Sequence, residues 1–242
     1  MFEEMNEKIR LAGVIATVTV EDADQAEKIA ASMLKGNLYA MEITFRTKNG
    51  QEGIDNICSC IERIARSFPQ ILLGAGTVTS ASLAKMAFSA GASYIVAPGF
   101  NPSTVDFCIS KKLPVYPGVN NPSQIEAAME KGLNLLKFFP AELSGGFKML
   151  KTLQGPFPNI SFIPTGGISL DNMGSYLKCP NVAAVGGSWM VKGSDDEIAE
   201  LCKKTYLQSL DLKITDFNLE DKKIWLSSLS SQRALPFFDA IG

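Results

Sequence analysis

Residues 135–140 read Leu135-Leu136-Lys137-Phe138-Phe139-Pro140, a short apolar run with a single lysine near its centre. In a β-strand, alternate side chains point to opposite faces, so Lys137 shares a face with Leu135 and Phe139. The pattern predicts a strand whose lysine points into apolar surroundings.

Strands and helices alternate on both sides of this run. Strands are expected at 14–20, 38–45, 71–77, 94–97, 115–119, 135–139, 161–165 and 182–187. Helices are expected at 23–35, 52–68, 80–90, 103–112, 122–131, 146–153, 171–178 and 195–207. Such alternation predicts an α/β fold with a parallel sheet, and these eight units predict a closed (β/α)₈ barrel, the TIM barrel. An open doubly wound sheet is the alternative, but the glycine-rich dinucleotide turn that it would more naturally carry does not follow the first strand.

The two ends of the chain are predicted to lie outside the alternation. Phe2, Met5 and Ile9 recur at helical spacing, which predicts a short N-terminal helix that covers one end of the core. We expect residues 1–210 to form the barrel with this helix. Residues 211–242 form a C-terminal extension with much apolar surface, expected to pack on the barrel or on a neighbouring subunit. A strand or hairpin near Leu212 and Ile214, followed by a short helix, is the expected structure of the extension.

Composition narrows the classes of function. The 242 residues carry a net charge of −2 and are 46% hydrophobic, which is typical of one globular domain without a nucleic-acid partner. The N-terminus has no apolar core segment, and no apolar run approaches the ~18 residues of a membrane span, so a cytoplasmic protein without a membrane partner is expected. The five cysteines are expected to be reduced and mostly buried. Because histidine is absent, carboxylates, tyrosines or a lysine must carry any acid–base chemistry.

Lys137 is the first candidate for that chemistry. Burial disfavours a charged ammonium and favours the free amine, which can attack a carbonyl carbon. The alternative is a lysine at a strand end whose stem lies on apolar surface while its head reaches water.

The second expected strand supplies two further ionisable groups. Alternation places Tyr39, Met41, Ile43 and Phe45 under the helices and sends Ala40, Glu42, Thr44 and Arg46 to the barrel interior. Glu42 and Arg46 could form a structural ion pair. Because Lys137 is expected in the same interior, a functional cluster is the favoured interpretation.

Glycine pairs end the last two strands, at Gly166-Gly167 and Gly186-Gly187-Ser188. Glycine lets backbone N–H groups approach an anion, and the loops after strands seven and eight of such barrels commonly hold phosphate. A third glycine-rich turn, at residues 74–77, is expected to place the Thr77 hydroxyl near the same mouth, although an ordinary turn residue would need no function.

Several short motifs together resemble one known family. They are residues 41–47 (MEITFRT), 74–78 (GAGTV), 97–99 (APG), 117–119 (PGV), 137–142 (KFFPAE), 164–169 (PTGGIS) and 186–189 (GGSW). In this order they resemble the bacterial KDPG/KHG aldolases, class I lysine aldolases that cleave 2-keto-3-deoxy-6-phosphogluconate (KDPG) or 4-hydroxy-2-oxoglutarate (KHG). The chain departs from the family at Ala16-Thr17, where a Pro-Val pair is common, and at Leu170, which replaces a frequent proline.

The resemblance implies a Schiff-base mechanism. Lys137 would form the Schiff base with the keto acid, and Glu42 would act as general acid and base through a water molecule. The implied products are pyruvate and glyceraldehyde 3-phosphate, or glyoxylate from KHG, with no metal or organic cofactor. Similar proteins are homotrimers, so a homotrimer is expected here.

The resemblance also implies roles in substrate binding. Arg46 and Thr77 would bind the substrate carboxylate, Phe139 would pack on the pyruvyl part, and Pro98 would shape the mouth. Thr165 would lie near the hydroxylated chain of the substrate. Gly166, Gly167 and Ser188 would hold the phosphate.

Two other functions are compatible with the same barrel. A phosphosugar isomerase or epimerase would share the phosphate loops but would not require a buried amine at Lys137. A barrel without catalytic activity could bind a phosphorylated acid, and Glu42 could then be neutralised without consequence.

Overall fold

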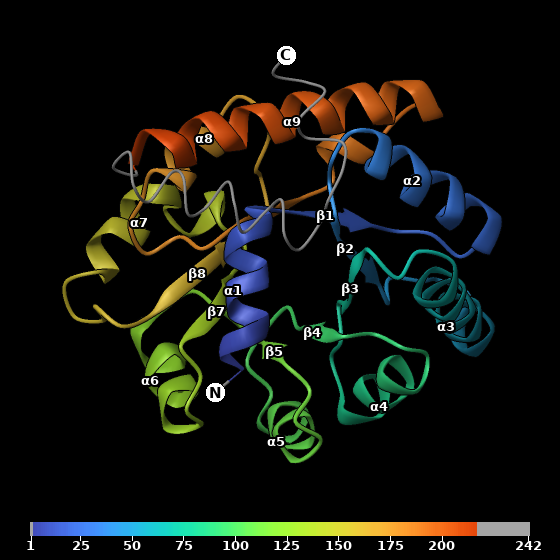
Figure 1. The fold of residues 1–242 in the computed structure, drawn as a ribbon. Coiled ribbons are helices and arrows are strands. Elements are labelled where there is room, and N and C mark those ends of the chain that lie inside the picture. The colour runs from blue at the N-terminus through green and yellow to red at the C-terminus, as the bar shows by residue number, and fades with distance from the viewer. Residues whose placement is uncertain (1, 217–242) are drawn as a thin grey trace.

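The computed structural model describes residues 2–216, in which parallel strands are surrounded by helices. In Figure 1, α2 to α9 form a ring around the strands, and α1 lies over one end of them. The strands are β1 (Val14–Val18), β2 (Ala40–Thr44), β3 (Leu72–Gly76), β4 (Tyr94–Val96), β5 (Val115–Tyr116), β6 (Gly118–Val119), β7 (Leu135–Phe138), β8 (Ser161–Pro164) and β9 (Val185–Gly187). The helices are α1 (Glu3–Ala12), α2 (Ala23–Lys35), α3 (Gly50–Ser67), α4 (Ala81–Ser89), α5 (Pro102–Ser110), α6 (Pro122–Glu130), α7 (Gly146–Leu153), α8 (Met173–Leu177) and α9 (Asp195–Asp216), with 3₁₀ turns η1 (Glu142–Ser144) and η2 (Trp189–Val191).

The strands form two parallel sheet sections, which confirms the predicted α/β class. One section has the order β5-β4-β3-β2-β1-β9, and the other has the order β6-β7-β8. The predicted fifth strand is split into β5 and β6 at Pro117, because proline lacks the N–H that a continuous ladder needs. Isolated parallel bridges join Phe162 to Val182 and Thr165 to Gly186, between the β8 and β9 segments.

Two apolar layers lie on the two faces of the strands. Leu136 and Phe138 belong to the larger layer, between strands and helices. Leu135 belongs to the smaller layer, on the face of the strands away from the helices α2 to α9, together with Tyr94 and Tyr116. The alternation predicted for β7 is therefore confirmed, and the face that carries Lys137 is the interior one.

Helix α1 covers one end of the interior layer, as predicted. Ile9 is fully buried in that layer. The buried Asn6 amide donates a hydrogen bond to Asn134 Oδ1 at 3.0 Å, and its oxygen accepts one from the Tyr116 hydroxyl at 3.1 Å. The helix thus closes the end of the strands opposite to their carboxyl ends.

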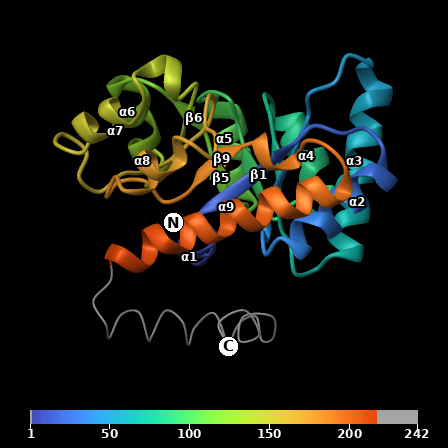
Figure 2. The same ribbon diagram turned by 90° about the horizontal axis from the view of Figure 1, so that it is seen from above.

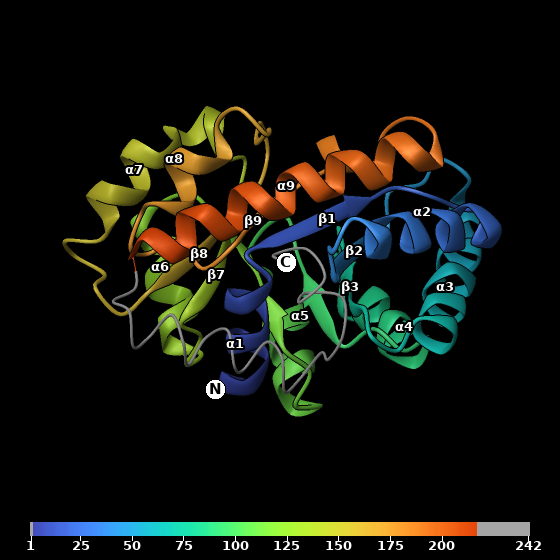
Figure 3. The ribbon, with the colours of Figure 1, turned by 45° about the horizontal axis from the view of Figure 1, so that its top comes forward.

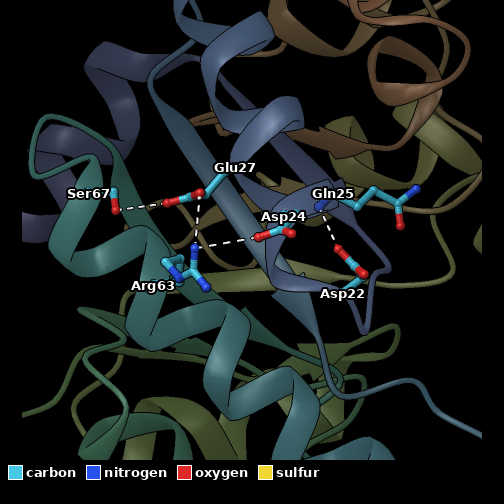
Figure 4. Close-up of polar contacts among 6 residues, drawn as sticks. All are labelled: Asp22, Asp24, Gln25, Glu27, Arg63 and Ser67. Atoms are coloured by element: carbon cyan, nitrogen blue, oxygen red, sulfur yellow. Dashed lines mark hydrogen bonds and ion pairs between the residues drawn. The ribbon is translucent and has the colours of Figure 1, made fainter.

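Helices α2 and α3 are joined at the surface by polar contacts (Figure 4). Arg63 on α3 lies 3.2 Å from Glu27 and 3.5 Å from Asp24 on α2, and the Ser67 hydroxyl donates to Glu27 at 2.9 Å. Because these ion pairs are partly exposed, each contributes at most about 1 kcal/mol, and the apolar contact beneath them dominates.

Asp22 caps α2, and this contact supports a stability prediction. Its Oδ1 accepts a hydrogen bond from the Gln25 N–H at 2.7 Å (Figure 4). Asp22→Ala should lower the free energy of unfolding by about 1 kcal/mol, because one N–H of the first turn loses its partner. Urea unfolding followed by circular dichroism measures the change. Asp22→Asn keeps an acceptor and should be nearly neutral; equal losses in both variants would contradict the capping role.

Helix α9 is longer than predicted and runs to Asp216. It packs against α2, α8 and β1 (Figures 2 and 3). The prediction of a strand or hairpin near residues 212–214 is therefore wrong. Two alternating apolar residues are only a weak indication of a strand. A helix that has already formed extends by further residues at little cost in free energy, so it continues through them. The rest of the expected extension, 217–242, lies outside the described residues.

Two further expectations concern cysteines and membranes. All five cysteines are free, and each except Cys58 is buried. Burial raises the pKa of the Cys60 thiol to about 11 and that of Cys108 to about 12, so both remain protonated.

In the part of the chain that the structure describes, every helix falls short of the length or hydropathy that crossing a membrane requires.

Candidate active site

Lys137 and Glu42 meet on the inner face of the strands. Lys137 lies on β7 and Glu42 on β2, and both strands turn these side chains inward. The Lys137 Nζ atom lies 3.6 Å from Glu42 Oε1, and the side chains are only 6% and 3% exposed. A buried amine beside a buried carboxylate allows a proton to pass between them.

Glycines of β3 make room for this pair. A Cβ atom added to Gly76 would lie 2.0 Å from Glu42 Oε1, and one added to Gly74 would lie 2.2 Å from the Tyr94 ring. The Tyr94 hydroxyl donates to the Met41 carbonyl at 3.0 Å. Burial, and then the Glu42 carboxylate, raise the pKa of Tyr94 well above its usual value, so this phenol remains neutral.

A cavity of about 450 Å³ opens beside the pair. It is lined by six of the predicted site residues, namely Arg46, Phe139, Thr165, Gly166, Gly167 and Ser188, together with Thr17, Thr19, Ile168, Gly187, Val191 and Lys192. Phe139 connects the cavity to the pair, because Lys137 Nζ lies 5.3 Å from the centre of its ring. The structure thus brings the buried amine, the carboxylate, the Gly166-Gly167 loop and the Gly187-Ser188 end of β9 to one region.

Thr77 and Pro98 are not among the residues that line this cavity. Thr77 directly follows β3 and is half-buried, with φ at 55°. Gly74 and Gly76 are strand residues rather than parts of the predicted turn. Pro98 is half-buried, and its carbonyl oxygen lies so close to Gly118 that a Cβ there would be 2.1 Å away.

The sequence interpretation missed three polar residues of the lining. Thr17 lies on β1 and Thr19 directly follows it, and the same alternation that was applied to β2 could have found them. Thr17 is the register partner of Glu42 on β2. Within residues 2–216, neither Thr17 Oγ1 nor Glu42 Oε1 has a hydrogen-bond partner, although both atoms are buried. Lys192 lies in an irregular segment, where no periodic signal points to it.

The Gly166-Gly167 loop packs against the side chain of Glu142. Both glycines have positive φ, 99° and 82°, and a Cβ on Gly167 would lie 2.5 Å from Glu142 Cγ. The Glu142 N–H donates to the Gly166 carbonyl at 3.1 Å, and the Glu142 carboxylate accepts a hydrogen bond from the Tyr176 hydroxyl. Both positions therefore favour glycine, and both residues line the cavity.

Comparison with known proteins agrees with this geometry. The family model for KDPG and KHG aldolase matches residues 5–203. The 2-dehydro-3-deoxy-phosphogluconate aldolase of Haemophilus influenzae is 39% identical over 209 residues, which cover 84% of this chain and 95% of that protein.

Two solved structures are also similar. The KDPG aldolase of Legionella pneumophila, with pyruvate captured as a covalent carbinolamine intermediate, has a TM-score of 0.77 and 32% identity over 83% of this chain and 97% of its own. The 2-keto-3-deoxy-6-phosphogluconate aldolase of Zymomonas mobilis ZM4 with 3-phosphoglycerate has a TM-score of 0.76 and 32% identity, covering 85% and 96%. This chain belongs to the KDPG and KHG aldolase family.

Proposed function

We propose that this protein is a class I aldolase that cleaves KDPG into pyruvate and glyceraldehyde 3-phosphate. The observation that carries the proposal is the buried Lys137–Glu42 pair, 3.6 Å apart, beside a cavity with two glycine loops. The names of the relatives and the carbinolamine in the Legionella pneumophila structure support it. We propose cleavage of KHG as a second reaction of the same active site.

Lys137 forms the covalent intermediate. Glu42 accepts a proton from the Lys137 ammonium, and the free amine attacks the C2 carbonyl of the keto acid. The protonated Glu42 returns its proton to the carbinolamine hydroxyl, which leaves as water and gives an iminium ion. The iminium ion accepts the electron pair of the C3–C4 bond when that bond breaks. Protonation of the resulting enamine at C3 and hydrolysis release pyruvate and restore the amine.

Glu42 moves the protons of these steps. The buried Oε1 of Glu42, which makes an ion pair but no hydrogen bond, and the nearby Thr17 hydroxyl leave hydrogen-bonding capacity for a water molecule or for the C4 hydroxyl of the substrate. The carboxylate takes the C4 hydroxyl proton during cleavage, and it returns a proton to C3 of the enamine.

The other predicted residues bind the substrate. Arg46 holds the C1 carboxylate with its planar guanidinium, and Thr77 adds a hydroxyl contact when substrate is bound. Phe139 packs on the pyruvyl part, and Pro98 shapes the mouth.

The phosphate end of the substrate lies against the glycine loops. Thr165 contacts the hydroxylated chain, and Gly166, Gly167 and Ser188 hold the phosphate. The backbone N–H groups of these residues supply uncharged donors, as is usual for phosphate sites.

Trapping with borohydride tests the proposal. Incubation with pyruvate and borohydride should attach a reduced pyruvyl group to the peptide that contains Lys137, as read by mass spectrometry. An unmodified Lys137, or absence of KDPG cleavage in the same preparation, would favour an isomerase or a binding protein instead.

A glycine substitution separates phosphate binding from the chemistry. Gly167→Ala should raise the KM for KDPG about tenfold, because the added Cβ meets Glu142 and the loop must shift. Trapping of pyruvate, which has no phosphate, should be unchanged. Gly50→Ala is the matched control, since Gly50 also has positive φ but has open space around it; an equal KM increase in both variants would contradict a local effect.

We also propose the finer architecture. The bridges between β8 and β9, together with the single proline between β5 and β6, support one closed (β/α)₈ barrel. Residues 1–210 form this barrel domain; because α9 continues to Asp216, the expected start of the extension at residue 211 lies inside a helix. A cytoplasmic homotrimer follows from the family resemblance, and the exposed apolar side chains of Leu143 and Phe147 support a subunit contact near the site. Light scattering that gives three times the 26.1 kDa chain mass would support it; one chain mass would contradict it.

A further inference from the structure

Lys192 is a cation on the cavity wall that the proposed mechanism leaves without a role. It follows the turn η2 and lines the same cavity as Ser188, Gly166 and Gly167. The residue is exposed, so its ammonium is accessible to a ligand.

The segment that carries Lys192 is anchored in the fold. The Trp189 indole N–H donates to Thr205 Oγ1 of α9 at 3.1 Å, and its ring fills the space left by the missing side chain of Gly187. Met190 is fully buried, and its carbonyl accepts a weak hydrogen bond from the Cys202 thiol. The backbone of Lys192 therefore starts from a fixed position beside the glycine loops.

Among residues 2–216, the charged residues that line the cavity are Arg46 and Lys192, and no carboxylate lines it. Within the same part of the chain, neither cation lies within ion-pair distance of an acidic side chain. The nearby carboxylate of Glu197 accepts hydrogen bonds from the Ser194 N–H and hydroxyl at 2.7 and 2.8 Å, which lower its pKa. It is thus engaged at the start of α9 rather than with Lys192.

We propose that Lys192 binds the phosphate of the substrate and gives the enzyme its preference for phosphorylated over unphosphorylated keto acids. The inference rests on the proposed function, in which Arg46 takes the carboxylate at the other end. The glycine loops supply directed but uncharged N–H donors, and Lys192 adds the positive charge that a phosphate dianion requires. KHG ends in a C5 carboxylate next to the reacting carbons rather than in a phosphate dianion, so it gains less from this charge.

Steady-state kinetics of Lys192→Gln tests the proposal. The KM for KDPG should rise about tenfold while kcat changes less than about twofold, because contact with the phosphate is the same in the ground and transition states. The KM for KHG should change less than about twofold. Inorganic phosphate should inhibit the wild type competitively and the variant about tenfold more weakly.

Two matched variants and one trapping experiment complete the test. Lys111→Gln removes an equal exposed charge just before β5, at the opposite end of the strands, and should leave every constant unchanged. Lys192→Arg should restore most of the affinity for KDPG. Trapping of pyruvate on Lys137 should be normal in Lys192→Gln, which separates this inference from the proposed aldol chemistry. Equal losses for KDPG and KHG, or unchanged inhibition by phosphate, would overturn the role of Lys192, even if the wild type is an aldolase.

Discussion

Lys137→Arg should abolish aldol cleavage, with a loss of at least about 10⁴-fold in kcat. The guanidinium stays protonated near neutral pH, so it cannot attack the C2 carbonyl, and the covalent route is closed. Because enzymes accelerate reactions by at least about 10⁶-fold, removal of the covalent route should leave activity close to background. Release of pyruvate from KDPG, followed with a coupled dehydrogenase, measures the loss.

Arginine is the informative replacement at this buried position. It keeps a positive charge beside Glu42, whereas Lys137→Met would leave the carboxylate buried and unpaired, at a cost of about 3–5 kcal/mol. Circular dichroism and thermal unfolding should therefore show a folded Lys137→Arg protein that borohydride and pyruvate fail to modify. If arginine proves too large for the site, Lys137→Gln provides a smaller variant with the same expected absence of trapping. Residual cleavage above about one per cent in a folded variant would contradict the Schiff-base mechanism.

The arrangement of strands and helices could be predicted because its signals are local. The period of two in β2 and β7 assigned Glu42 and Lys137 to the interior without any knowledge of the partner strands. Helix starts also carry local signals, such as Asp22, which caps the first turn of α2. The same rules failed at residues 212–214, where a short alternation competed with a helix that was already formed.

The contacts of the site were harder to predict because they depend on neighbouring strands. Gly74 and Gly76 suggested a turn, yet they are strand positions left without side chains so that Tyr94 and Glu42 fit. Their role becomes visible only once the register of β2 against β3 is known. Lys192 gave no signal, since its place beside the cavity depends on how Trp189 packs against α9.

Glu42→Gln should reduce kcat for KDPG by at least about 10²-fold, the usual contribution of a general acid–base group. Glutamine has the shape of glutamate, so it should fit against Gly76, which leaves no room for a larger group. The amide cannot accept the proton of the Lys137 ammonium or of the C4 hydroxyl. The variant should also lose the exchange of C3 protons of pyruvate with deuterium, which proton NMR follows directly.

The outcome for Glu42→Gln differs in kind from that for Lys137→Arg. The amine is still present, so pyruvate should become trapped on Lys137 slowly but completely, whereas Lys137→Arg should never be modified. Thr104→Val, which changes a buried and unpartnered hydroxyl on α5, is the control for a general effect of altering a buried polar group and should keep normal turnover. Normal cleavage and proton exchange in Glu42→Gln would remove Glu42 from the mechanism. Its buried contact with Lys137 would then serve only to hold the lysine in place, and another group at the cavity would have to move the protons.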